Sequence, residues 1–322
     1  ELGVALNKED VLHCVFIPII TFEGRVLNLF KLLSKHKCNT AFFARGGLPV
    51  GGKTSNFINK ILGKESIFLS SKKLVSTLTN SFAKLYKALK IVSSYGTVFC
   101  SGQIAIDTYS KESKVVKINY FDYDTYLLQK HITDRLVEDG PYCVFLDDHL
   151  VDDFDYQIIG IKGLTAETYY KELNNFFDLV EEKHKLKVVI AAHPKSNYIK
   201  NEFRNRIVIK NKTNELVKDC DFVMAHYSSS VSYAVCHKKP VLFMSTEEMT
   251  ERPYYVFIRG LSEALGSKIL NISNISDDQN IVVTNIDENK YDKYKYDFLT
   301  SKESETMLSR EIFLEYLCGR QH

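Results

Sequence analysis

The chain has 322 residues, of which 45% are hydrophobic and 25% are charged, and its formal net charge is +2. This composition is typical of a globular protein with one large or two ordinary domains, and the small net charge excludes a strong overall field for binding nucleic acid. Seven scattered cysteines, none in a C-x-x-C pair, argue against a disulfide framework and a structural zinc site and indicate a reducing cytoplasm.

The first part of the chain alternates between strand and helix patterns. Predicted strands lie at residues 11–20, 39–49, 97–102 and 113–121, and predicted helices at 23–37 and 71–94. Alternating strands and helices favour a parallel sheet with helices on both faces. A turn signal, "EDGP" at residues 138–141, ends this part.

The same alternation restarts after that turn. Predicted strands lie at 142–148, 187–194, 206–210, 221–227 and 241–244, and predicted helices at 165–185, 213–220 and 231–237, with Thr165 as a helix N-cap. A last helix at 303–319 is expected to pack back on the first part of the chain. The predicted division is therefore one α/β domain over residues 1–140, a second over 141–300 and a C-terminal helix over 301–322.

Two polar motifs follow predicted strands of the second domain. His193-Pro194 ends the strand "KVVIAAHP", where an imidazole could bind a phosphate and Lys195 adds positive charge, although a loop histidine can also simply pack. Ser228, Ser229 and Ser230 stand between a strand and a helix, where hydroxyl and N–H groups form an anion site or a plain helix cap. Both motifs fall at the carboxyl edge of one parallel sheet, where ligands bind.

Three further groups are candidates on the same reasoning. Asp147 and Asp148 end the strand at 142–148, where paired carboxylates can shift a pKa and provide a general base or a nucleophile, or form a solvated acidic loop. His226 precedes the serines and faces either a ligand or the core. Gly46-Gly47, Asp122 and Asp124 are expected in loops of the first domain, where they would contact an acceptor or form ordinary turns.

The strand–"HP"–strand–serine–helix pattern, over residues 142–244, resembles bacterial GT-B glycosyltransferases that use CMP-activated acid sugars: sialyl-, polysialyl- and Kdo-transferases. The resemblance implies two Rossmann-like domains facing a cleft, with His193, Pro194, Ser228 and Ser229 at the nucleotide and a nearby carboxylate in catalysis. The acidic motif departs from the family pattern because His149 stands where glycine is usual, and because inverting sialyltransferases carry it in the first domain.

The resemblance implies a nucleotide-sugar donor as substrate, no cofactor, and a glycan or lipid-linked acceptor in surface polysaccharide synthesis. No metal ion is expected, because no D-x-D pattern stands at a strand end of the donor domain. A cytoplasmic location is expected, and peripheral association with the inner membrane is left open. The alternatives are a CDP-glycerol-type phosphotransferase, which would share the serine pair and "KKPVLFM", a UDP-sugar transferase, and a binding protein on a decayed enzyme fold.

Overall fold

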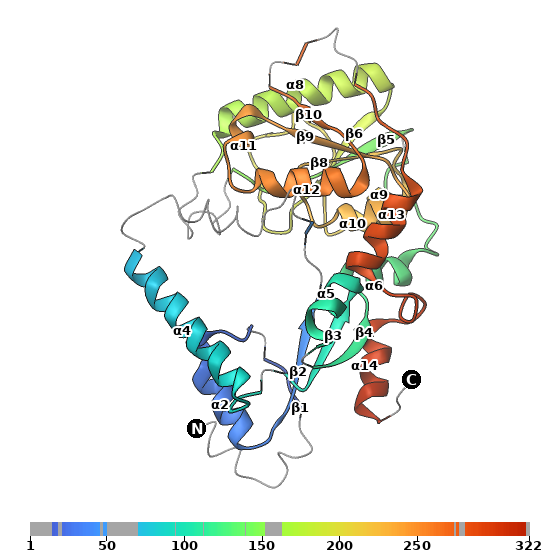
Figure 1. Cartoon of the computed structure of the whole chain (residues 1–322). Helices are drawn as coiled ribbons and strands as arrows, with labels where there is room; N and C mark the ends of the chain where they lie inside the picture. Colours follow the sequence, from blue (N-terminus) through green and yellow to red (C-terminus); the bar gives the residue numbers. More distant parts are fainter. Residues whose placement is uncertain are drawn as a thin grey trace. The chain divides into compact units, whose positions relative to one another are not determined.

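The computed structural model describes residues 15–18, 21–45, 48–49, 70–93, 95–111, 113–138, 140–151, 163–273, 275–276 and 281–319. Contacts divide these residues into two compact units. The first unit contains the described residues up to 45, from 70 to 119 and from 300 onward, and the second contains 48–49 and 120–299. Each unit has one parallel sheet with helices, so the predicted α/β class with two Rossmann-like domains is confirmed (Figure 1).

The first unit is built on four parallel strands in the order β1-β2-β3-β4. They are β1 (Val15–Phe16), β2 (Asn39–Ala44), β3 (Thr97–Ser101) and β4 (Lys114–Ile118). Every residue of β3 is buried, as the continuous apolar run of a central parallel strand requires. The helical segments are η2 (Gly24–Val26), α2 (Leu27–Lys35), α4 (Ser70–Ala88) and α5 (Gly102–Tyr109).

The C-terminal helix α14 (Ser309–Leu317) covers one face of this first sheet. The Phe313 ring lies edge-on to the Phe99 ring of β3, with centroids 5.3 Å apart, and the hydroxyls of Tyr316 and Thr97 are 2.8 Å apart. The prediction that the last helix packs back on the first part of the chain is therefore confirmed. The helix begins at Ser309, after a stretch of turns, and not at residue 303.

The second unit has six parallel strands in the order β10-β9-β8-β5-β6-β7. They are β5 (Tyr142–Leu146), β6 (Lys187–Ala192), β7 (Val208–Lys210), β8 (Val223–Ala225), β9 (Val241–Ser245) and β10 (Ile269–Asn271). The chain runs from β5 outward to β7, returns beside β5 as β8, and continues to β10. This is the Rossmann order, and its topological switch point lies between β5 and β8.

Helices lie on both faces of the second sheet, with α8 (Ala166–His184) on one side of it and α12 (Tyr255–Leu265) on the other (Figure 1). The remaining helical segments are α6 (Phe121–Gln129), α9 (Thr213–Asp219), α10 (Val231–Cys236), α11 (Glu247–Thr250), α13 (Glu288–Tyr294) and the π-helical turn η4 (Lys295–Leu299). Thr165 is the N-cap residue of α8 as predicted, but its side chain makes no capping hydrogen bond.

The division between the units falls at Asn119 and Tyr120, before the turn at residues 138–141 where the sequence places it. The reason is α6, which buries Tyr123 in the core of the second unit. Gln129 at its other end accepts a hydrogen bond from Asn214 of α9 at 2.8 Å. Helix α6 therefore belongs to the second unit, although it precedes the first strand of that unit's sheet.

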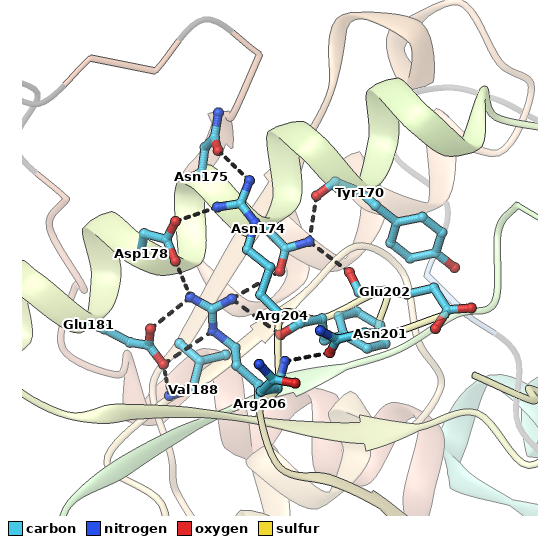
Figure 2. A network of polar contacts seen from close by, with 12 residues as sticks. Tyr170, Asn174, Asn175, Asp178, Glu181, Val188, Asn201, Glu202, Arg204 and Arg206 are labelled. Carbon is cyan, nitrogen blue, oxygen red and sulfur yellow. Dashed lines mark hydrogen bonds and ion pairs between the residues drawn. The ribbon is translucent and has the colours of Figure 1, made fainter. Parts of the chain in front are cut away.

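A buried guanidinium joins α8 to the segment that leads into β7 (Figure 2). The Arg206 side chain is 7% exposed and bonds to Asp178, Glu181 and Asn174 of α8, at 2.5, 2.7 and 2.9 Å. Arg204 is half exposed and reaches only the rim of the same network, at Asp178 and Asn175. The network therefore fixes the segment after β6, which carries the His193-Pro194 motif at its start.

Candidate functional site

The polar motifs of the second unit follow three neighbouring strands. Leu146 at the end of β5 pairs in register with Ala191 of β6 and with Ala225 of β8. Asp147-Asp148, His193-Pro194 and the serines come shortly after these three residues, so they reach the same edge of the sheet. Since this edge includes the switch point between β5 and β8, it is the place where a Rossmann-type sheet binds ligands.

A cavity of about 380 Å³ opens at this edge, a size typical of small-molecule sites. Its polar lining consists of Asp147, Asp148, His193, Thr213, Tyr227 and Ser228–Ser230. The carboxylates, the histidine and the serines are predicted from the sequence to lie at one sheet edge, and all of them line this cavity. Thr213 and Tyr227 are not predicted, because their only signal in the sequence is their position near strand ends.

Asp147 ties the loop after β5 to the loop after β6. Its Oδ1 accepts a hydrogen bond from the backbone N–H of His149 at 2.9 Å. Its Oδ2 accepts bonds from the backbone N–H of His193 at 2.9 Å and from the Tyr198 hydroxyl at 2.5 Å. The side chain is buried, and these three donors provide hydrogen bonds to both of its oxygens. Asp147 is therefore an anchor that sets the position of the histidine motif.

Asp148 has a different environment. Its Oδ2 accepts a hydrogen bond from the backbone N–H of Tyr227 at 3.2 Å, and its carboxyl group also bonds the Ser228 side chain. Burial and the neighbouring Asp147 carboxylate raise the pKa of Asp148 well above its usual value. The two carboxyl groups are therefore inequivalent, one held as an anchor and the other with an increased affinity for a proton.

His193 is held by both its backbone and its ring. Its Nδ1 accepts a hydrogen bond from the backbone N–H of Lys195 at 3.2 Å, so the proton of the neutral ring sits on Nε2. The ring stacks on His149, with centroids 6.0 Å apart. Pro194 also lines the cavity, whereas the exposed Lys195 is not among its lining residues.

His149 takes a backbone conformation that usually requires glycine. Its φ is 53°, in the left-handed region. Glycine would adopt this conformation without strain. In this chain the position carries an imidazole, which stacks on the His193 ring.

The serines are not simple helix caps. Ser230 is the N-cap residue of α10, but its side chain makes no capping hydrogen bond. The Ser228 side chain bonds Asp148 and the Ser229 side chain bonds the Tyr120 hydroxyl. Within the described part of the chain, no hydrogen bond engages the backbone N–H groups of Ser228, Ser229 and Ser230. These groups remain available to an anion in the cavity.

The prediction that His226 contacts a ligand is wrong. The side chain is fully buried, its Nδ1 donates to the Met244 carbonyl at 2.7 Å, and its Nε2 accepts from the Tyr169 hydroxyl at 3.1 Å. Both ring nitrogens are thus satisfied by the core. Burial lowers the pKa of His226 to about 4, so the ring stays neutral.

His226 predicts a pH dependence of stability. Its folded-state pKa lies below the ordinary value of 6.5, so the unfolded chain takes up a proton first, and stability falls as pH decreases from about 6.5 to about 4. His226→Gln should flatten this fall, measured as the urea midpoint at about pH 7 and about pH 5. His237, whose pKa is also lowered to about 4, leaves part of the slope in place. The control is replacement of the exposed His131, which should leave the difference between the two urea midpoints unchanged. A His226→Gln protein that loses as much stability at about pH 5 as the original would contradict this role of His226.

The predicted acceptor residues lie elsewhere than expected. Asp122 and Asp124 are in the first turn of α6, in the second unit and not in a loop of the first domain. Asp122 is bonded to the side chains of Ser232 and Tyr233 of α10, and burial raises its pKa. It joins two helices and is not a lining residue of the cavity. Gly46 and Gly47 lie outside the described residues.

Among the described residues, no group of three or more His, Cys, Asp or Glu side chains could hold a metal ion. Within the same part of the chain, no helix combines the length and the apolar character needed to cross a membrane.

Comparison with known proteins identifies the fold but no family. No family and no curated protein matches the sequence. A solved glycotransferase of kitacinnamycin is 10% identical with a TM-score of 0.51, over 98% of this chain and 78% of its own. Similarity also extends to the calicheamicin glycosyltransferase, which is 11% identical with a TM-score of 0.47, over 90% of this chain and 70% of its own. The UDP-GlcNAc 2-epimerase of Methanocaldococcus jannaschii is 11% identical with a TM-score of 0.47, over 99% of this chain and 80% of its own. The chain therefore has the α/β class with two parallel-sheet domains found in GT-B glycosyltransferases.

Proposed function

We propose that this protein is a glycosyltransferase that moves an acid sugar from a CMP-activated donor to a surface-glycan acceptor, without a metal ion. One observation carries the proposal: the Asp-Asp, His-Pro and serine motifs converge on a single cavity at the switch point of a Rossmann-type sheet. These are the motifs by which the sequence resembles CMP-sugar transferases.

The cavity offers the groups that such a donor needs. The N–H groups of the serine loop and the His193 ring would bind the phosphate of CMP, and these fixed donors would stabilise the charge that develops on it as the sugar leaves. Asp148 would accept the proton of the acceptor hydroxyl, because burial and the Asp147 carboxylate raise its pKa and so make its deprotonated form a stronger base. Asp147 would keep the loop of His193 in place.

The first test is the affinity for CMP itself. His193→Ala should weaken CMP binding by roughly 1.5–3 kcal/mol, the range for a hydrogen bond to a charged group. Calorimetry on the folded variant measures it, and replacement of the exposed His131 is the matched control. An unchanged affinity in a folded His193→Ala protein would remove the histidine from the site.

A donor-hydrolysis panel then distinguishes the alternatives. The proposal expects slow hydrolysis of CMP-sialic acid or CMP-Kdo, and little of CDP-glycerol or UDP-sugars. Hydrolysis of CDP-glycerol would favour a polyol-phosphate transferase, and hydrolysis of a UDP-sugar would favour that class of donor. A protein that neither binds CMP nor hydrolyses any of these donors would be a binding protein on an enzyme fold, and the proposal would be wrong.

A further inference from the structure

Two histidines stand next to each other at the edge of the cavity. The rings of His149 and His193 are parallel to within 2°, with their centroids 6.0 Å apart, which is the geometry of an offset stack. His193 lines the cavity, and His149 directly follows the lining residue Asp148. His149 itself is half-buried and is not a lining residue, so any effect that it has on a ligand passes through the His193 imidazole.

A single carboxylate holds the backbones of both histidines. The Oδ1 atom of Asp147 accepts from the His149 N–H, and its Oδ2 atom accepts from the His193 N–H, each at 2.9 Å. The Tyr198 hydroxyl donates to the same Oδ2, and the Tyr198 ring lies edge-on to the His149 ring, with centroids 6.3 Å apart. These contacts fix the spacing between two loops that follow different strands, β5 and β6. The histidine pair is therefore built by tertiary contacts and is not a chance meeting of two surface side chains.

The backbone conformation of His149 is costly for a residue with a large side chain. Its φ of 53° lies in the left-handed region, which is uncommon for residues other than glycine. In the described part of the chain, the other non-glycine residues with positive φ are lysine, arginine or asparagine, so His149 alone brings a ring into this region. Such strain persists only where the surrounding contacts over-determine it, and it gathers at functional sites. The bond to Asp147 and the two ring contacts supply that support here.

We propose that His149 is a positioning residue for phosphate binding in this cavity. By stacking, its ring holds the His193 imidazole in one orientation, while the Lys195 N–H fixes the tautomer through Nδ1. The Nε2–H group of His193 is then preorganised, so less conformational freedom is lost when a phosphate oxygen accepts from it. The inference rests on the proposed function, because it takes the phosphate of a nucleotide as the ligand of His193.

A variant without the ring tests the role of His149. His149→Asn keeps the N–H that bonds Asp147, and asparagine tolerates the left-handed region. It should weaken CMP binding about three- to tenfold, the range for the loss of one aromatic pair, and should leave the melting temperature nearly unchanged. The affinity for cytidine, which has no phosphate, should not change. Calorimetry measures both affinities, and replacement of the exposed His131 by asparagine is the matched control.

Restoring a ring at this position separates stacking from a general effect on the loop. His149→Phe provides an aromatic face without ring nitrogens, so it should recover most of the CMP affinity that His149→Asn loses. A bulky side chain at positive φ lowers stability, so the affinity is measured well below the melting temperature of this variant. A folded His149→Phe protein that binds CMP as weakly as His149→Asn would contradict stacking as the cause.

A double-mutant cycle decides whether the effect of His149 passes through His193. In the His193→Ala protein, His149→Asn should cause no further loss of CMP affinity. An equal loss with and without the His193 ring would overturn the proposal, as would equal losses for CMP and cytidine. If the original protein binds CMP and the His149→Asn protein binds it equally well, only the role of His149 is wrong. If the original protein binds no CMP, the proposed function is wrong as well.

Discussion

Asp148→Asn is expected to lower kcat for sugar transfer by about 10²–10⁴, the usual contribution of a positioned general base. Asparagine retains the shape of the side chain, and its amide oxygen can still accept from the Tyr227 N–H, so CMP affinity should stay nearly unchanged. The measurement is kcat under saturating donor, with CMP affinity by calorimetry. If the variant retains near-full turnover, the proton acceptor lies elsewhere.

The pH dependence of turnover is an independent test of Asp148 as the general base. A base with a raised pKa works only above that pKa, so turnover should rise with pH on a limb shifted above the range of an ordinary carboxyl group. Asp148→Asn should remove this limb from whatever activity remains. A rising limb that persists in the variant would assign it to another group.

Asp147→Asn serves as the comparison within the pair. Asp147 accepts bonds from two backbone N–H groups and the Tyr198 hydroxyl, and an amide in its place has only one acceptor oxygen. This variant should lose CMP affinity and stability as well as turnover, since it releases the loop of His193. The Asp148 variant should lose turnover alone, so the two substitutions separate anchoring from catalysis.

Arg206→Ala should lower the free energy of unfolding by about 3 kcal/mol, the lower end of the range for breaking a buried ion pair. The guanidinium is 7% exposed and bonds to two carboxylates, which are 52% and 32% exposed and so stay partly solvated when it is removed. Urea denaturation of the purified protein measures the change.

Arg204→Ala is the matched control for this network. Arg204 shares Asp178 with Arg206 but is 48% exposed, so its loss should cost less than about 1 kcal/mol. Equal losses in the two arginine variants would mean that burial is not what gives Arg206 its effect. Arg206→Lys should recover only part of the stability, because an ammonium group lacks the planar fork that reaches several acceptors.

The strands and the site edge could be predicted because both depend on local pattern. Apolar runs such as β5 and β6 mark buried parallel strands, and polar residues directly after them fall at one edge of the sheet. Asp147, Asp148, His193 and the serines were found in this way. The sequence alone could not separate the two carboxylates, since Asp147 acquires donors from Tyr198 and from the backbone N–H of His193, both in the segment after β6 and about fifty residues away.

Other features depend on contacts that leave no local signal. The unit to which α6 belongs is decided by Asn214 and Ser232, which lie 85 and 110 residues from their partners on α6. The position of His226 at the strand end suggested a ligand contact, but the partners of its ring, Tyr169 and Met244, come from α8 and β9. A single histidine directly after a strand has no sequence pattern that separates a core role from a binding role.

The cover that α14 gives to the first sheet has a consequence for biosynthesis. Thr97 of β3 meets Tyr316, a residue 219 positions later in the chain. While the ribosome makes the protein, the first sheet must wait with one apolar face incomplete until the whole second unit has been translated, whereas the second sheet has all its strands earlier. The second sheet is therefore expected to be complete before the first sheet is covered, and the apolar face that α14 later covers stays exposed until the end of synthesis.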